Sequence, residues 1–209
     1  ERGLKNMEKF KLTRGEKAWI LYDVGNSAFI LLVSTIIPIY FNALAAGEGI
    51  SDSDYLAAWG YAGSVSTLLV AVSSPLLGTL ADRRNMKPIL FVASLILGAL
   101  GCACLGFAWG WVSFLVIFVI AKVGYSSANV FYDAMLPEIT TESRMDKVSS
   151  LGYAFGYIGS CIPFILSLVV VLFYERFGIS QTTAMLIAFL ITTVWWVGLT
   201  IPLLRTYRH

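Results

Sequence analysis

The sequence contains little charge and almost no histidine. Only 13% of its 209 residues are Asp, Glu, Lys or Arg, one is His, and 57% are hydrophobic, with a mean hydropathy of +0.75. So little polar surface cannot cover a water-soluble globule, which indicates an integral membrane protein. The net charge of +2 provides no broad basic surface, so no nucleic-acid partner is expected.

Cysteine is scarce as well. Cys102, Cys104 and Cys161 all fall in apolar stretches, and residues two positions apart point to different sides of a helix, so we expect small buried hydrophobes and no metal site. The single histidine, His209, is the last residue. A phosphate-binding loop of the form Gly-x4-Gly-Lys-Ser/Thr is missing, which argues against ATP hydrolysis within this sequence. No cofactor is expected.

Long apolar stretches dominate what is present. A helix of about 20 apolar residues spans the hydrocarbon core of a bilayer. The stretches of this kind are residues 18–45, 56–81, 88–107, 112–135, 149–173 and 182–204. We therefore predict an all-α, polytopic membrane protein with six transmembrane helices. The first stretch is too long for a cleavable signal peptide and is expected to remain as the first helix.

The positions of the cations predict the orientation. Nearly all of the 15 lysines and arginines lie in the amino-terminal tail, in the loops after the second and fourth stretches, and at the carboxyl end. Such short basic segments stay in the cytoplasm. We therefore expect residues 1–17 and 205–209 to be cytoplasmic, the latter starting a linker, around a transmembrane domain of residues 18–204. A start at Met7 favours residues 1–6 as a cloning remnant.

Three ionisable residues lie inside the apolar stretches: Asp23, Lys122 and Asp133. A charge at the centre of a bilayer costs about 2.5 to 3.5 kcal/mol on insertion scales, so it is retained mainly where a helix bundle or watery cavity uses it. These three residues are therefore the first functional hypothesis.

The fourth stretch carries a polar stripe. Lys122, Ser126, Asn129 and Asp133 follow the spacing of one helix face. At a rise of 1.5 Å per residue, Lys122 lies about 16 Å from Asp133, so the same helix cannot neutralise it.

The first stretch carries a weaker stripe. Asp23, Ser27 and Ser34 share a face that Ile30 interrupts, and Asn26 lies beside it. We expect both stripes to contact a substrate or protons. The alternative is that their Asn, Ser and Asp side chains only join helices through buried hydrogen bonds. Other features are interpreted structurally: Gly152, Gly156 and Gly159 as a packing surface, and Pro38 and Pro75 as kinks.

The loop after the second stretch resembles the signature Gly-x-Leu-x-Asp-Arg-x-Gly-Arg-Lys of the major facilitator superfamily. The matching residues are Gly78, Leu80, Asp82, Arg83 and Lys87. Asn85 replaces a glycine, which is tolerable because Asn also adopts left-handed backbone conformations, and Met86 replaces a cation. We interpret Gly78, Asp82, Arg83 and Lys87 as a conformational gating loop.

Within that superfamily, residues 22–29 and 129–138 resemble the helix 1 and helix 4 signatures of the autophagy-related vacuolar amino-acid effluxers and their bacterial relatives. The resemblance implies two six-helix halves, each made of two inverted three-helix repeats, that alternate around a central site. It also implies that both signatures line the cavity. Only one half is present, so the partners expected are the carboxy-terminal half or a second copy as a homodimer.

We therefore predict half of a secondary active transporter in a bacterial cell membrane, not an enzyme. It would move small polar or zwitterionic solutes, amino acids among them, by alternating access coupled to protons. Burial disfavours a charged carboxylate, so Asp23 or Asp133 could carry the proton, and Lys122 could bind a carboxylate of the substrate or of the missing half.

Two alternatives remain open. A six-helix scaffold or channel subunit would not need the loop signature or the polar stripes. An intramembrane aspartyl protease would use paired aspartates such as Asp23 and Asp133, each preceded here by tyrosine, but it needs a Gly-x-Gly-Asp motif that the sequence lacks.

Overall fold

The computed structural model describes residues 10–83 and 85–207, and this part of the chain is helical apart from short loops. Six spans in it are long and apolar enough to cross a membrane, which confirms the predicted fold class. The elements are α1 (Arg14–Ser34), α2 (Ile36–Gly47), α3 (Asp52–Ala81), α4 (Met86–Cys104), the 3-10 turn η1 (Leu105–Phe107), α5 (Trp111–Ile139), α6 (Glu142–Leu172) and α7 (Gln181–Thr206).

The first span is broken into α1 and α2 at Thr35, whose backbone angles of φ −132° and ψ −72° are not helical. Pro38 explains the break, because a proline donates no backbone hydrogen bond and its ring clashes with the carbonyl group four residues earlier. The kink predicted at Pro38 is therefore present. Pro75, in contrast, lies inside a single uninterrupted helix, α3.

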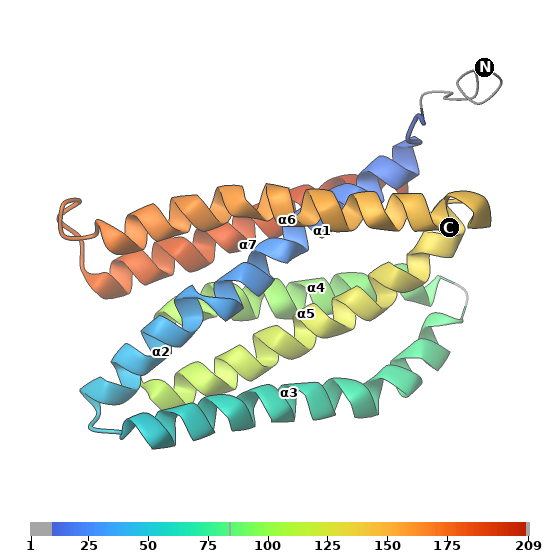
Figure 1. Ribbon diagram of the computed structural model, residues 1–209. Helices are drawn as coiled ribbons and strands as arrows, with labels where there is room; N and C mark the ends of the chain where they lie inside the picture. Colours follow the sequence, from blue (N-terminus) through green and yellow to red (C-terminus); the bar gives the residue numbers. More distant parts are fainter. Residues whose placement is uncertain (1–9, 84, 208–209) are drawn as a thin grey trace, which may run out of the picture.

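The spans form two triplets, and the first helix of each triplet packs against the two later helices of the other triplet. The first triplet is α1 with α2, then α3 and α4; the second is α5, α6 and α7. Helix α1 packs against α6 and α7, while its counterpart α5 packs against α3 and α4, and α4 meets α7. Successive spans run in opposite directions (Figure 1), so each helix is antiparallel to its counterpart. Reciprocal contacts of this kind, between antiparallel counterparts, are those expected of two inverted three-helix repeats.

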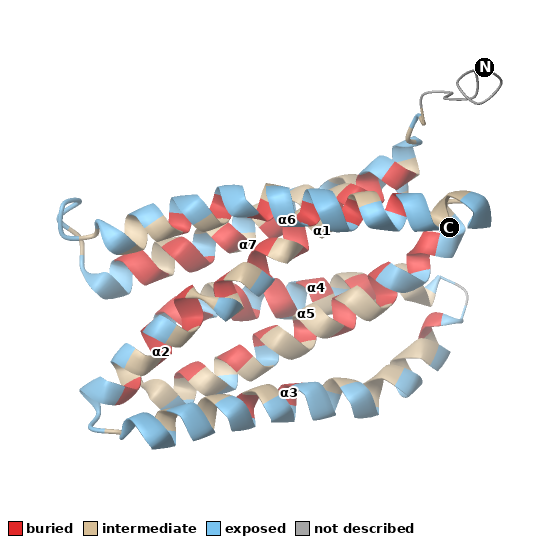
Figure 2. Ribbon diagram, in the orientation of Figure 1, coloured by how far each residue is buried: buried red, intermediate tan, exposed pale blue. Residues whose placement is uncertain are grey.

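Burial is uneven across the bundle (Figure 2). The most apolar stretches of α3 and α6 are the least buried, whereas α1, α4, α5 and α7 supply most of the core. The largest side chains of that core are aromatic, among them Trp196, Phe29 and Phe118. Cys102 is buried as predicted, but Cys104 and Cys161 are exposed, so the expectation of three buried cysteines is wrong for two of them.

One end of the bundle gathers the basic loops. Helix α1 begins and α7 ends there, together with the α3–α4 loop and the α5–α6 junction (Figure 1); we call it the basic end. The Glu16 carboxylate, 1% exposed, accepts hydrogen bonds from Nε and Nη2 of Arg144, each at 2.7 Å. Thr140 donates to the same carboxylate at 2.6 Å. This cluster fastens the start of α1 to the α5–α6 junction.

Candidate functional site

Helices α1, α5 and α6 surround a cavity of about 200 Å³. Five of the predicted site residues line it: Asp23, Asn26 and Ser27 from α1, and Asn129 and Asp133 from α5. The two sequence stretches that carry the helix 1 and helix 4 signatures therefore meet at one place. Asp133 is exposed there and Asp23 is half-buried, so the two residues differ in burial.

Hydrogen bonds hold the two signatures together behind the cavity. The Asn129 side-chain oxygen accepts from Nδ2 of Asn26 at 2.9 Å and from the Tyr22 hydroxyl at 3.2 Å. One helical turn nearer the basic end, the Trp19 indole N–H donates to the backbone oxygen of Tyr132 at 3.1 Å, and the two rings stack with centroids 4.3 Å apart. The predicted helix-joining role therefore applies to Asn26 and Asn129, which also line the cavity.

Two glycines of α6 make room for the Asp23 side chain. A Cβ atom added to Gly152 or to Gly156 would lie 3.3 Å from the Asp23 Oδ2 atom. At Gly152 it would also stand 2.7 Å from the Trp19 ring, and at Gly156 it would stand 2.9 Å from Ser27 Oγ. The glycine surface predicted for helix packing is thus confirmed, and it lets α6 approach α1 at the carboxylate itself.

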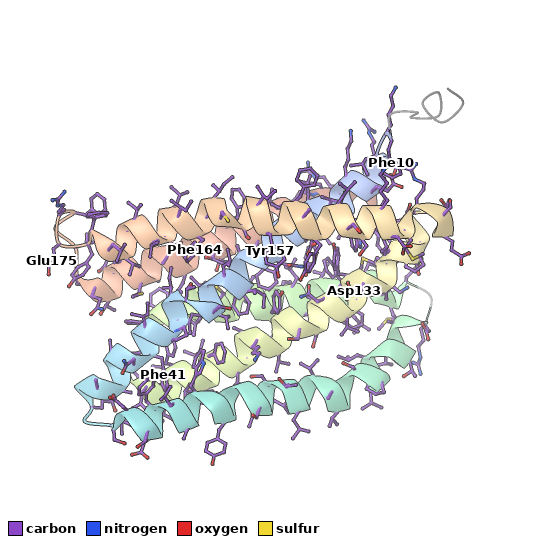
Figure 3. The ribbon with its side chains drawn as sticks, viewed as in Figure 1. Phe10, Phe41, Asp133, Tyr157, Phe164 and Glu175 are labelled. Carbon is purple, nitrogen blue, oxygen red and sulfur yellow. The ribbon has the colours of Figure 1, made fainter. Side chains whose placement is uncertain are left out.

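Sequence reasoning missed the aromatic part of the wall. The cavity is also lined by Tyr125, Tyr132, Tyr153, Tyr157 and Ser160. On α6, Tyr153, Tyr157 and Ser160 share one face by helical spacing. This spacing could have indicated a polar face on α6. It was overlooked because tyrosine counts as an apolar residue in a search for buried charges. Figure 3 shows Asp133 on α5 and Tyr157 on α6 at the facing sides of these helices.

Three predicted site residues, Ser34, Ser126 and Lys122, do not line this cavity. Ser34 is exposed and donates to the backbone oxygen of Ile30 at 2.8 Å. Ser126 and Lys122 are half-buried, and neither lines the cavity. Ser126 directly follows the lining residue Tyr125 on α5, so its absence from the wall reflects the side of the helix that it occupies.

Lys122 instead faces α3. Its Nζ atom lies 5.9 Å from the centre of the Phe118 ring, and a Cβ atom on Gly63 of α3 would lie 3.8 Å from it. Phe118 in turn stacks on Trp59 with ring centres 4.4 Å apart. Among the described residues no Asp or Glu forms an ion pair with Lys122.

The predicted gating loop lies at the basic end, outside the cavity. Asp82 and Arg83 are exposed, and a Cβ atom on Gly78 would meet no atom within 4 Å. Asn85 adopts the left-handed conformation, with φ 63°, that glycine adopts most readily. This confirms that the substitution for glycine is conformationally tolerated.

The last residue of the loop signature, Lys87, ties together three helices. Its Nζ atom forms an ion pair with Glu138 of α5 and donates to the backbone oxygen of Ala134 at 3.2 Å. Glu138 also accepts a hydrogen bond from the hydroxyl of Tyr207, directly after α7. The loop signature is thus anchored to the end of the helix 4 signature.

The family of the chain follows from comparison with known proteins. The family model described as "Vacuole effluxer Atg22 like" matches residues 13–209. The chain belongs to this family. The match covers the loop signature and both cavity-lining signatures, and it agrees with the resemblance found in the sequence.

Two known proteins are similar in sequence to this chain. The chain is 38% identical over 200 residues to an "Uncharacterized MFS-type transporter YxiO" of Bacillus subtilis (strain 168), covering 93% of this chain and 47% of that protein. It is 27% identical over 150 residues to an "Uncharacterized protein" of Aquifex aeolicus (strain VF5), covering 71% of this chain and 36% of that protein. No solved structure matches significantly. The chain thus spans about half the length of these relatives or less.

The family description names an effluxer and the Bacillus relative is named as a transporter of the major facilitator type, which agrees with the expectation that the chain is not an enzyme. Paired aspartates in one cavity are therefore not assigned to proteolysis. In the described residues no group of three or more His, Cys, Asp and Glu is placed to hold a metal ion.

Proposed function

We propose that this chain is one half of a secondary active transporter, and that the cavity between α1, α5 and α6 is its substrate and proton site. The observation that carries the proposal is the meeting of Asp23 and Asp133 in one cavity, although they come from separate signatures. A charge retained at membrane depth is expected where a water-filled pathway uses it. The family match and the transporter-type relative support the same class of activity.

The two carboxylates supply a means of proton coupling. Two ionised carboxylates that share a cavity repel each other, and binding of a proton or a cation relieves that repulsion. Asp133 is exposed and Asp23 is half-buried against the glycines of α6. A proton would therefore enter through Asp133 and be held at Asp23. Since Asp23 lies on α1 beside α6, a change in its charge would alter the contact between these helices.

The transported solutes in this proposal are small and polar, with amino acids as the leading class. Hydrogen-bonding groups and acids line the cavity, whereas Lys122 supplies a positive charge elsewhere in the membrane region. In the proposal Lys122 binds a carboxylate, either of a passing substrate or of the remaining half of the transporter. Its lack of an ion pair among the described residues supports that role.

The partner in the proposal is a second set of six helices, either the carboxy-terminal half of a longer chain or a second copy. The relatives are about twice the length of this chain or more, which favours a carboxy-terminal half. The exposed apolar faces of α3 and α6 offer surface for such a partner as well as for lipid (Figure 2). In this arrangement the basic end faces the cytoplasm of a bacterial cell, because short basic segments remain on that side.

Transport in proteoliposomes tests the proposal. The full-length transporter that contains this chain would be reconstituted with a pH-sensitive dye inside, and amino acids, peptides and organic acids would be added in turn. We expect one of these solutes to drive proton movement, and Asp133→Asn to abolish that movement while the protein still folds. Ser34→Ala, a change outside the cavity, is the control. Full proton flux with Asp133→Asn would remove Asp133 from the pathway. A complete lack of solute movement would favour the scaffold or channel-subunit alternative.

A further inference from the structure

The wall of the cavity has an unusual chemical bias. Its polar side chains include two carboxylates, Asp23 and Asp133, and four tyrosines, and none of its lining residues is Lys, Arg or His. Carboxylates attract cations, and the faces of tyrosine rings do so as well. The cavity is therefore suited to a cationic group and unsuited to an anionic one.

Tyr132 gives an independent sign that a ligand completes the site. Its side chain lines the cavity and is only 3% exposed, yet its hydroxyl has no hydrogen-bond partner among the described residues. Trp19 stacks on its ring, and the centre of the Tyr22 ring lies 4.5 Å away, so two aromatic neighbours from α1 hold the ring in place. A buried hydroxyl without a partner is costly, and a bound polar group or water in the cavity would satisfy it.

Two further tyrosines of α6 contribute rings at the more exposed part of the cavity. Tyr153 and Tyr157 are 66% and 55% exposed, and their rings meet edge to face with centres 4.8 Å apart. Their hydroxyls lie 3.0 Å from each other. This pairing fixes the two rings relative to each other on the side of the cavity opposite α5.

We propose that this cavity is an ammonium site: it binds the cationic amine of the transported solute between the carboxylates of Asp23 and Asp133 and the tyrosine rings. The inference rests on the proposed transport function and narrows its substrate class to organic amines, with or without a carboxylate. A cavity of about 200 Å³ accommodates an ammonium group bearing a few carbon atoms, because an engineered protein cavity of about 150 Å³ is large enough to bind benzene.

The position of Lys122 supports a cavity that recognises the amine of the solute and not its carboxylate. In an α-amino acid the amine and the carboxylate are attached to the same carbon atom. Lys122 lies about 16 Å from Asp133 along α5 and faces α3. One bound α-amino acid therefore cannot place its amine deep in the cavity and have its carboxylate held by Lys122 at the same time. The cavity itself selects the amine, and the carboxylate is not required for binding there.

A pair of molecules that differ only in charge tests the inference. Choline and 3,3-dimethylbutan-1-ol have the same shape, but the nitrogen cation of choline is a neutral carbon atom in the alcohol. Binding to the full-length transporter would be followed by the shift of its thermal unfolding, with sodium chloride at matched ionic strength as the blank. We expect choline to bind about tenfold or more tightly than the alcohol, and methylammonium to compete with it.

Substitutions of cavity residues test whether choline binds in this cavity. Asp23→Asn and Tyr157→Leu are expected to weaken choline binding about tenfold, whereas Tyr157→Phe, which keeps the ring, retains it. The matched control is Tyr61→Leu, because Tyr61 is a 72% exposed tyrosine on α3 that does not line the cavity. Equal binding of choline and the alcohol would overturn the inference, as would unchanged affinity in both Asp23→Asn and Tyr157→Leu, or no response to either cation beyond the salt blank.

The same experiments separate this inference from the transport proposal. Proton-coupled uptake of a neutral or anionic solute, in a protein whose cavity ignores choline, would refute the ammonium site and leave the transporter intact. Choline binding that depends on Asp23 and Tyr157, in a protein that moves no solute, would support the site and refute transport.

Discussion

Asn26 on α1 donates its side-chain amide to the side-chain oxygen of Asn129 on α5 at 2.9 Å, across 103 residues of sequence. The same oxygen accepts the Tyr22 hydroxyl. A single polar atom thus accepts hydrogen bonds from two residues of the helix 1 signature, and it joins the two helices that carry Asp23 and Asp133.

Removal of this acceptor is expected to loosen the site. Asn129→Ala deletes two hydrogen bonds, each worth about 0.6 kcal/mol between membrane helices, so the free energy of unfolding should fall by about 1 kcal/mol. Thermal unfolding in detergent measures the loss. The matched control is Ser126→Ala on the same helix, where no hydrogen bond of the side chain is recorded among the described residues. An equal loss in both variants would contradict a joining role for Asn129.

The glycines of α6 predict a contrast between two identical substitutions. In Gly156→Ala the added methyl group would lie 2.9 Å from Ser27 Oγ and 3.3 Å from the Asp23 carboxylate, so α6 must shift, at a cost of about 1 to 3 kcal/mol. In Gly198→Ala on α7 it meets no atom within 4 Å, and higher helix propensity should stabilise the protein by about 0.5 to 1 kcal/mol. Thermal unfolding of both variants checks the opposite signs. Similar effects would mean that the α1–α6 approach at Gly156 is not tight.

The ion pair between Glu16 and Arg144 predicts a strong local effect at the basic end. Arg144→Ala would leave the Glu16 carboxylate, 1% exposed, without its charged partner. Breaking a fully buried pair costs about 3 to 5 kcal/mol, and because Arg144 is partly exposed we expect a smaller loss of stability. Arg144→Lys keeps the charge but loses the two-pronged hydrogen bonds, so its stability should fall in between. Denaturant unfolding measures the free energy of unfolding of the parent and both variants. Equal stability of Arg144→Ala and the parent would contradict the prediction.

Lys122 is expected to show opposite effects on stability and transport. Lys122→Met keeps the length of the side chain and removes a charge that has no ion-pair partner among the described residues. A charge at membrane depth costs energy, so the variant should be at least as stable as the parent. Solute uptake should fall at least tenfold if the amine binds a carboxylate during transport. Thermal unfolding and uptake in proteoliposomes are measured on the same preparation, and unchanged uptake kinetics would rule out that role.

The link between Lys87 and Glu138 predicts energetic coupling between the loop signature and α5. Lys87→Met and Glu138→Gln are each expected to destabilise the protein by about 1 kcal/mol or less, since the pair is partly exposed. The double variant should lose less than the sum of the two, because the interaction can be lost only once. A double-mutant cycle of unfolding free energies measures this coupling. Strict additivity would show that the pair contributes nothing.

The helices themselves were predictable because hydropathy and length act locally. Each apolar stretch of the sequence corresponds to one span, the break before Pro38 follows from proline's missing N–H, and Asn85 takes the left-handed conformation that its place in the loop signature requires. These features depend on a residue and its near neighbours in the sequence. For that reason they needed no knowledge of how the helices pack.

The composition of the site was only partly predictable. Helical spacing correctly placed Asn129 and Asp133 on one face, but it could not say that Lys122, farther along the same face, would lie against α3 instead of the cavity. Periodicity identifies which residues share a face and not which neighbouring helix that face meets at each depth. Tyr153 and Tyr157 were missed because tyrosine counts as an apolar residue in a search for buried charges, and only the packing of α6 brings their shared face to the cavity.

From its sequence alone this protein could be assigned to a six-helix membrane fold, to a transporter family and to a short set of membrane-embedded polar residues, because the bilayer penalises every charge and every unpaired backbone group. The tertiary structure decided which of those residues act together. The close approach of α6 to α1 at Gly152 and Gly156 encloses Asp23 and Asp133 with tyrosines in one cavity and leaves Lys122 outside it. Contacts between helices far apart in the chain determine that grouping, and no local pattern encodes them.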